Sequence, residues 1–393
     1  LYKFEGSARV RTRLNPHYRV PMSHPSRHDG PPETGAGAFS PHSVRLAWIL
    51  AAAYLLVIVY ASLQPFQGWR TPPQEILYFL SAAWPRFITL QDVMINVAAY
   101  APLGLLLSIG WGARHGPARG ALAAALAAAA LSLAMEATQM FLPSRIASNV
   151  DLLANSMGAL LGAMAAPLLA PSRVLGGKLH AARHRLFLDG MAADVGLVVV
   201  FLWLVTQFHP TAQLFGTGSL RAIIDLPAYF IHTPRLAFSS EAVVVVFNLL
   251  GVGLILSALM REATRVLIVT GVVIGVALAI KVFTAAVLIR SPAPLAWLTP
   301  GVWVGLAAGS ALLYAAARQP RPAQFAISAA CIAVATVAIN LAPDNPYQSV
   351  PSRLLAGGAS HFLSFSGIVR AFSDLWPLLA TGFLLYALSV RLR

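Results

Sequence analysis

Long uninterrupted apolar runs constrain this chain more than any other feature of its sequence. A helix needs about 20 apolar residues to cross roughly 30 Å of hydrocarbon, and it is the single-segment structure that satisfies its own backbone polar groups there. The pattern therefore predicts an all-α, polytopic integral membrane protein. We place ten spans at residues 44–64, 92–112, 118–141, 150–170, 190–208, 240–260, 266–289, 299–317, 324–342 and 373–390.

The composition agrees with this prediction and argues against a soluble protein. Of the 393 residues, 58% are hydrophobic and 11% are charged, whereas roughly a quarter are charged in a soluble globular protein. The first apolar run, Val44 to Leu63, exceeds the apolar stretch of about 7–15 residues in a cleaved secretory signal. We therefore expect this run to remain in the protein as a span.

The positions of Lys and Arg predict the orientation. The net charge is +14, and the cations lie in short patches between apolar runs, mostly on the side that holds the N-terminus. Because cytoplasmic loops carry the excess of Lys and Arg, we expect a multi-pass membrane protein with both termini cytoplasmic. This distribution gives no reason to expect a nucleic-acid partner.

The spans and the loops between them divide the chain into five predicted segments. They are a disordered basic cytoplasmic tail (1–43), a four-helix membrane domain (44–170), a basic cytoplasmic linker (171–189), a second four-helix membrane domain (190–318), and a C-terminal helix pair with an outer amphipathic loop (319–393).

Polar residues gather at one end of the first membrane domain. Its second, third and fourth spans each carry a polar pair three or four residues apart, a spacing that puts both side chains on one helix face. Polar side chains within membranes usually face a bundle interior or a water-filled cavity. The sequence predicts one outward-facing polar pocket lined by Asp92, Asn96, Glu136, Gln139, Arg145, Asp151 and Asn155.

The third and fourth spans form a hairpin that turns near Pro143 and Arg145. Glu136 precedes Pro143 by seven residues, or about 10 Å of helix, and we expect it to lie at the same depth as Asn155. Arg145 can bind a carboxylate or an anionic ligand such as phosphate through two parallel hydrogen bonds.

Small residues predict close helix packing in the same domain. Gly158 and Gly162 form G-x-x-x-G, Gly104 lies on the second span, and residues 121–134 are nearly all Ala and Leu. Such residues allow helix backbones to approach each other in membranes. We expect packing within one chain rather than dimerisation.

These motifs resemble those of the VanZ-like family. The resemblance covers roughly residues 45–170 and depends on four segments in order: SLQPF (62–66), DVMINVAAYAPLG (92–104), EATQMFLPSR (136–145) and DLLANSMGALLG (151–162). It implies a four-helix membrane module whose founding member is linked to low-level resistance to the glycopeptide antibiotic teicoplanin. It implies no settled biochemical activity for the family.

The order of spans and loops in the second membrane domain resembles that of the first, as in a degenerate parallel repeat. Lys281 precedes Arg290 by nine residues, as Glu136 precedes Arg145, so Lys281 and Arg290 are the candidate site residues of this half. The chemistry is not preserved, and coincidence among Ala- and Leu-rich spans is the alternative. Lys281 either forms a salt bridge to Glu136 or Glu241, or snorkels towards the interface.

No catalytic or metal-binding motif stands out, since H-E-x-x-H, a P-loop and Cys/His clusters are absent from the sequence. We expect no cofactor and no metal. Three hypotheses remain: binding or transport of an anionic lipid, a lipid-linked glycan or an amphipathic antibiotic, with Arg145 as the anion contact; an intramembrane enzyme with Glu136 or Asp151 as general base; and a purely structural polar network. We favour the first, with membrane lipids or cell-envelope precursors as partners.

Overall fold

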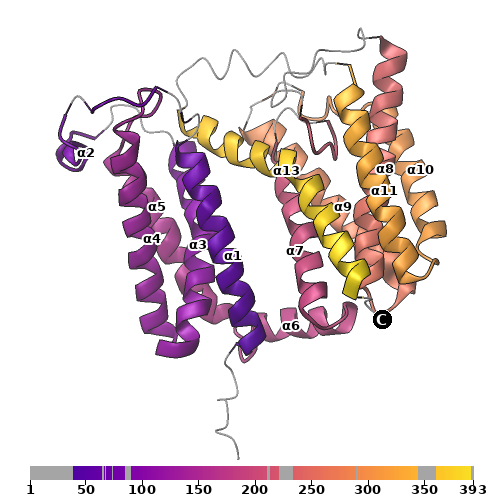
Figure 1. Cartoon of the computed structure of the whole chain (residues 1–393), viewed down its shortest axis with the longest axis horizontal. Coiled ribbons are helices and arrows are strands. Elements are labelled where there is room, and N and C mark those ends of the chain that lie inside the picture. Colours follow the sequence, from indigo (N-terminus) through magenta and orange to yellow (C-terminus); the bar gives the residue numbers. More distant parts are fainter. Residues whose placement is uncertain are drawn as a thin grey trace, which may run out of the picture. The chain divides into compact units, whose positions relative to one another are not determined.

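The computed structural model describes residues 39–63, 66, 68–72, 74–84, 90–209, 213–220, 233–288, 291, 293–343 and 360–390. Within these residues the chain is all-α (Figure 1), and the one β-type pairing is an isolated bridge between Phe187 and Met260. Eight of the described helices are long and apolar enough to cross a membrane. The prediction of an all-α polytopic membrane protein is confirmed.

The first membrane domain is built from four long helices. They are α1 (Pro41–Leu63), α3 (Leu90–His115), α4 (Pro117–Gln139) and α5 (Asn149–Ala165), which continues as the 3₁₀ helix η1 (Ala166–Leu169). A short helix, α2 (Tyr78–Ser81), lies between α1 and α3 in the chain. Helix α3 packs against α1, α4 and α5, and α4 also packs against α5.

Glycines set the distance between α3 and α5. A Cβ atom added at Gly104, Gly158 or Gly162 would lie 1.9–2.2 Å from a backbone carbonyl oxygen of the other helix. No larger residue fits these positions unless the helices move apart. Lipid tails are as apolar as the helix side chains, so there is no hydrophobic driving force between helices in a membrane. Close backbone contact stabilises the helix pair instead.

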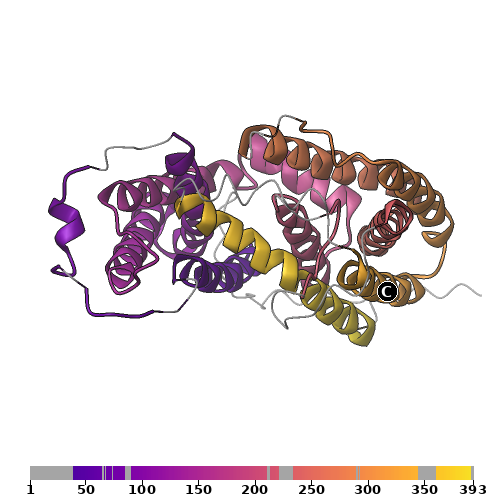
Figure 2. The same ribbon diagram turned by 90° about the horizontal axis from the view of Figure 1, so that it is seen from above.

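The described residues after 170 form seven further α-helices and two short helical turns. They are α6 (Val174–Leu186), α7 (Met191–Thr206), α8 (Pro234–Leu259), α9 (Val266–Phe283) with the π-helical turn η3 (Thr284–Leu288), α10 (Pro300–Ala316), α11 (Arg321–Leu341) and α13 (Ser360–Val390), with the short 3₁₀ helix η2 (Ala263–Arg265) before α9. Helix α8 packs against α10 and α11, and α13 packs against α7 and α11. These helices are seen from above in Figure 2.

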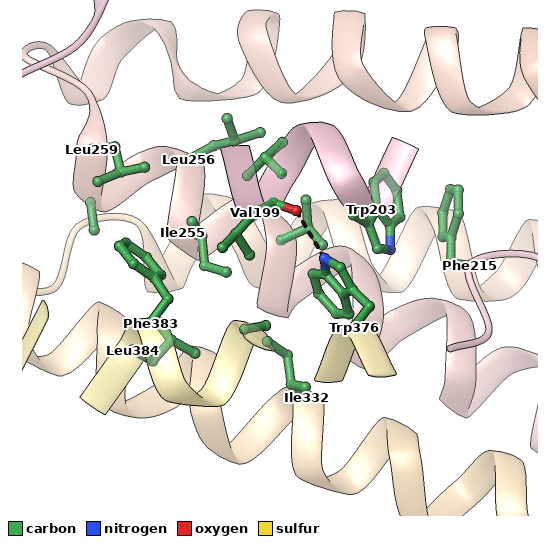
Figure 3. Packing of buried hydrophobic residues seen from close by; sticks show 14 of the residues in the cluster. Val199, Trp203, Phe215, Ile255, Leu256, Leu259, Ile332, Trp376, Phe383 and Leu384 are labelled. Atoms are coloured by element: carbon green, nitrogen blue, oxygen red, sulfur yellow. Dashed lines mark hydrogen bonds between the residues drawn. The ribbon is translucent and has the colours of Figure 1, made fainter. Parts of the chain in front are cut away.

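Large aromatic and aliphatic side chains fill the core between α7, α8, α11 and α13 (Figure 3). Trp203 and Trp376 are fully buried. The indole Nε1 of Trp376 donates a hydrogen bond of 2.8 Å to the carbonyl oxygen of Val199. This bond gives the polar end of a buried ring a partner.

Several predicted boundaries were wrong. Helix α8 begins at Pro234 rather than 240, because Thr233 caps it and Pro occupies its first turn. Helix α13 begins at Ser360, but its membrane-length part, Phe372–Val390, agrees with the predicted span 373–390. A hydropathy pattern identifies the apolar part of a helix. It does not identify the residues by which the helix extends beyond that part. Helices α7 and α10, with 16 and 17 residues, are shorter than the predicted spans.

Two predicted connecting segments also differ. The predicted linker 171–189 contains the helix α6. Of the predicted tail 1–43, residues 39–43 are described, and α1 already begins at Pro41; the remainder lies outside the described residues.

One helix pairing in residues 190–318 corresponds to a pairing in residues 44–170. Helix α8 pairs with α10 as α3 pairs with α5. Helix α4 packs extensively against both α3 and α5, whereas the corresponding helix, α9, makes few contacts with α8 and α10. The parallel repeat stays a prediction.

Candidate functional site

A buried carboxylate joins the end of α4 to the start of α5. The side chain of Glu136 is 3% exposed, and its Oε2 accepts a hydrogen bond of 2.8 Å from the backbone N–H of Ser148. Ser148 is the N-cap of α5, with its Oγ accepting from the N–H of Val150. A negative charge beside a helix N-terminus is stabilised by the N–H groups left unbonded there.

A second carboxylate links α5 to α3. Asp151, in the first turn of α5, is 6% exposed, and its Oδ1 accepts a hydrogen bond of 2.8 Å from Nδ2 of Asn96. Asp92 lies one turn earlier on α3 and is half-buried. The i,i+4 spacing of both pairs thus places polar groups from two helices at one end of their contact.

Glu136 lies nearer the end of the bundle than expected, and Asn155 lies about one helical turn deeper. Nδ2 of Asn155 donates a hydrogen bond of 2.9 Å to Oγ of Ser132, whereas Glu136 faces Ser148. The expectation that Glu136 and Asn155 share one depth was wrong, because α4 ends at Gln139 and Glu136 therefore lies in its last turn. Oδ1 of Asn155 is buried without a hydrogen-bond partner among the described residues.

Gln139 and Arg145 each donate a hydrogen bond to the end of α1. Nε2 of Gln139 donates to the carbonyl oxygen of Ser62 at 3.0 Å, and Nη2 of Arg145 donates to that of Ala61 at 3.1 Å. These bonds satisfy carbonyls in the last turn of α1 that have no partner within the helix. Burial lowers the pKa of Arg145, and the nearby carboxylate of Glu136 opposes this shift.

Charge is concentrated around Glu136. Its carboxylate interacts electrostatically with Asp151, which opposes its negative charge, and with Arg145, which favours it. The structure therefore brings Asn96, Glu136, Arg145 and Asp151 together, with Asn155 one turn away. Such a set can hold an anion at the arginine or exchange a proton at the carboxylates.

Sequence analysis missed four hydroxyl groups near these residues. The hydroxyl of Tyr54 donates to the carbonyl oxygen of Ala99 at 2.9 Å, and Tyr100 is buried beside Ser132. Ser148 was recognisable as an N-cap because Asp follows three residues later, a variant of the capping-box pattern. Ser132 and the two tyrosines are single hydroxyls in apolar runs, and no spacing marks them.

The comparison with known families supports the interpretation drawn from the four motifs. The family model VanZ/LLP1 matches residues 42–170, which include every residue of the polar cluster. Residues 42–170 are VanZ-like. The predicted resemblance is confirmed for this segment, and residues 171–393 lie outside the match. No curated protein and no solved structure matches the chain.

Outside the VanZ-like segment, Lys281 is the buried cation that the sequence singled out. It is 5% exposed, and its Nζ donates a hydrogen bond of 2.8 Å to the backbone carbonyl oxygen of His209. Its predicted companion, Arg290, lies outside the described residues. Burial, together with the charges of Lys281 and Arg370, lowers the pKa of His209 to about 3, so this ring is neutral at physiological pH.

No group of three or more His, Cys, Asp or Glu side chains forms a metal site within the part of the chain that the structure describes. Cys331 is buried and forms no disulfide. The expectation of no cofactor and no metal stays a prediction.

Proposed function

We propose that the VanZ-like segment binds, and in a cellular setting transports, an anionic component of the bacterial cell envelope. The ligand class is a phospholipid, a lipid-linked glycan or an amphipathic antibiotic, and a link to teicoplanin resistance belongs to this proposal. The site would face outwards from the inner membrane, with both chain termini cytoplasmic. The observation that carries the proposal is the position of Arg145, held against α1 beside the buried carboxylate of Glu136.

Arg145 suits an anionic headgroup for two reasons. Its planar guanidinium can offer two parallel N–H donors to a phosphate, and the bond to Ala61 fixes the side chain at one end of the bundle. Ile146, the next residue, is 77% exposed, so apolar surface adjoins the cation. The charged group of an amphipathic anion could bind Arg145 while its apolar part contacts Ile146.

The intramembrane enzyme is the second candidate, because Glu136 and Asp151 are two buried carboxylates in electrostatic contact. Paired carboxylates with different environments are typical of general acid and base catalysis. The hydrogen bonds to Ser148 and Asn96 also suit the third hypothesis, a structural network. The two candidates and this network make different predictions for the same variants.

The first experiment measures binding of phosphatidylglycerol and of undecaprenyl phosphate to the full-length chain by native mass spectrometry. We expect Arg145→Lys to weaken binding about tenfold, because an ammonium cannot reproduce the bidentate contact. Arg114→Gln, which removes an exposed cation near the opposite end of α3, is the control and should leave binding unchanged. Equal affinity of the wild-type chain and Arg145→Lys would overturn the proposal.

The same preparations distinguish binding from catalysis. We expect no chemical change in either lipid, and we expect Glu136→Gln to retain or strengthen binding because it removes a negative charge near Arg145. Conversion of undecaprenyl phosphate that Asp151→Asn abolishes, with binding retained, would establish the enzyme instead. Loss of stability in Glu136→Gln that Arg145→Gln restores would favour the structural network.

The proposed orientation has a separate test. In a Cys331→Ala background, a cysteine introduced as Ser144→Cys should react with a membrane-impermeant maleimide from outside intact cells, and one introduced as Ala181→Cys should not. Both positions are exposed, so access to reagent depends on the side of the membrane. The reverse pattern would place the Arg145 end in the cytoplasm and end the envelope proposal.

A further inference from the structure

We propose that α6 is an in-plane helix that binds the anionic phospholipid headgroups of the bilayer leaflet on its side of the membrane. This function lies outside the VanZ-like segment and does not depend on the Arg145 site. It gives a role to the segment between the two membrane domains, which sequence analysis treated only as a linker.

The neighbours of α6 in the chain place it at the membrane surface. It follows η1, which ends the apolar segment 149–169, and precedes the apolar helix α7. Figure 1 shows α6 running across the ends of the neighbouring helices instead of parallel to them. Since both flanking segments are apolar, a helix in this position lies along the interface.

The N-terminal half of α6 is docked against the end of η1. A Cβ atom on Gly176 would lie 2.1 Å from the carbonyl oxygen of Ala170 and 2.4 Å from that of Leu169. Glycine is therefore required at this contact. The contact also determines which face of α6 points towards the protein.

The C-terminal half of α6 is anchored by ion pairs and hydrogen bonds. Nη2 of Arg183 lies 2.6 Å from Oδ1 of Asp194 in the first turn of α7. Nε of Arg261, just after α8, donates to the carbonyl oxygens of His184 and Phe187 at 2.8 and 2.9 Å. With both halves held, the rotation of α6 about its axis is fixed.

The exposed surface of α6 combines apolar side chains with cations. Leu175 is 52% exposed and Leu179 is 54% exposed, and Lys178 and Arg185 are also exposed. At 3.6 residues per turn the two cations lie about 20° apart around the helix, and the two leucines lie about 60–120° from them, on the flank between the cations and the docked face. Adjacent apolar and basic strips are typical of helices that lie in the membrane interface and attract anionic lipids.

Neighbouring helix ends increase the positive potential on this side. Arg173, just before α6, and Arg318, after α10, lie on the same side as α6, because consecutive spans alternate in direction. The acidic residues next to α6 are already paired: Asp194 with Arg183, and Asp189 with Arg261 and His184. The cations of the exposed face of α6 therefore remain to attract phospholipid phosphate.

The test uses the full-length chain with Leu179→Cys in a Cys331→Ala background, labelled with a polarity-sensitive fluorophore and placed in nanodiscs. We expect blue-shifted emission when the discs contain phosphatidylglycerol and weaker shifts in pure phosphatidylcholine. Lys178→Gln with Arg185→Gln should weaken retention of phosphatidylglycerol about thirtyfold in native mass spectrometry and remove the lipid dependence of the emission.

The matched control is Arg114→Gln with Arg119→Gln, which removes the same charge from exposed positions on the same side but away from α6. It should leave the emission and its lipid dependence unchanged. Water-like emission in both lipids would overturn the interfacial position of α6. Equal blue shifts in both lipids, or equal loss in the control, would overturn headgroup recognition by α6.

Discussion

Helices pack against one another differently within the VanZ-like segment and within the part of the chain that follows it. Between α3 and α5 the backbones touch, because Gly104, Gly158 and Gly162 remove the side chains that would separate them. Between α7, α8 and α13 the gap is filled by large rings such as Trp203 and Trp376. The first arrangement depends on small residues and polar contacts, as expected in lipid, and the second depends on filled volume.

The same sequence pattern has different environments in the two regions. Gly158-x-x-x-Gly162 lies in the contact between α3 and α5, whereas Gly271-x-x-x-Gly275 on α9 has open space where a Cβ would stand. The spacing alone therefore does not determine packing. What differs is the partner: α5 has α3 along its length, and α9 contacts few residues of its neighbours.

The largest expected effect tests the volume-filled region. Trp376→Ala should lower the free energy of unfolding by about 3–5 kcal/mol, because it empties a fully buried site and removes the donor to Val199. Trp303→Ala, at a position that is 59% exposed, should change it by less than about 0.5 kcal/mol. Thermal unfolding in detergent measures both. Equal losses in the two variants would contradict the assigned core.

The second prediction tests the backbone contact. Gly162→Val should destabilise the protein by about 1–3 kcal/mol, because the new Cβ would lie 1.9 Å from the carbonyl oxygen of Ala101. Gly271→Val is the matched substitution in the open G-x-x-x-G and should lie within about 0.5 kcal/mol of the wild-type chain. If both variants unfolded at the same temperature, the contrast between α5 and α9 would be wrong.

The two regions also differ in how far their structure followed from the sequence. Hydropathy predicted a helix at each of the ten proposed spans, because apolarity and length are local properties. It missed α6, whose mixture of Leu, Lys and Arg resembles a loop in composition, and the starts of α8 and α13, which extend beyond the apolar part. These features depend on caps and tertiary contacts that a hydropathy scan does not contain.

The polar cluster shows the same limit at the level of single residues. The i,i+4 spacing placed Asn96 and Asp151 among the residues of one predicted pocket, because each helix face is determined by sequence, and the structure joins the two by a hydrogen bond. The depth of Glu136 relative to Asn155 could not be obtained this way, because it depends on where α4 ends and how the turn to Ser148 is made. Lys281 donates to a backbone carbonyl, that of His209, and a carbonyl acceptor has no sequence signature.

The third prediction compares buried serines in the two regions. Ser132→Ala removes the acceptor for Nδ2 of Asn155 and should cost about 1 kcal/mol, since the amide would be left buried without that bond. Ser328→Ala removes a donor to the carbonyl oxygen of Gly251, which lies inside α8 and has a helical N–H donor as well. Its cost should be less than about 0.5 kcal/mol. A larger loss for Ser328→Ala than for Ser132→Ala would contradict this contrast between the two hydrogen bonds.

The smallest expected effect concerns His209, beside the buried Lys281. The pKa of this ring is about 3 in the folded protein and about 6.5 in an unfolded chain. Between these values the unfolded chain binds a proton that the folded protein does not, so stability falls as the pH drops below about 6.5. The loss between pH 7 and 6 should be less than about 1 kcal/mol. His209→Gln should reduce this pH dependence, whereas His115→Gln, at an exposed position, should leave it unchanged. If stability changed with pH by the same amount in the wild-type and His209→Gln chains, the ring would be open to water. The end of α7 would then be packed as loosely as α9.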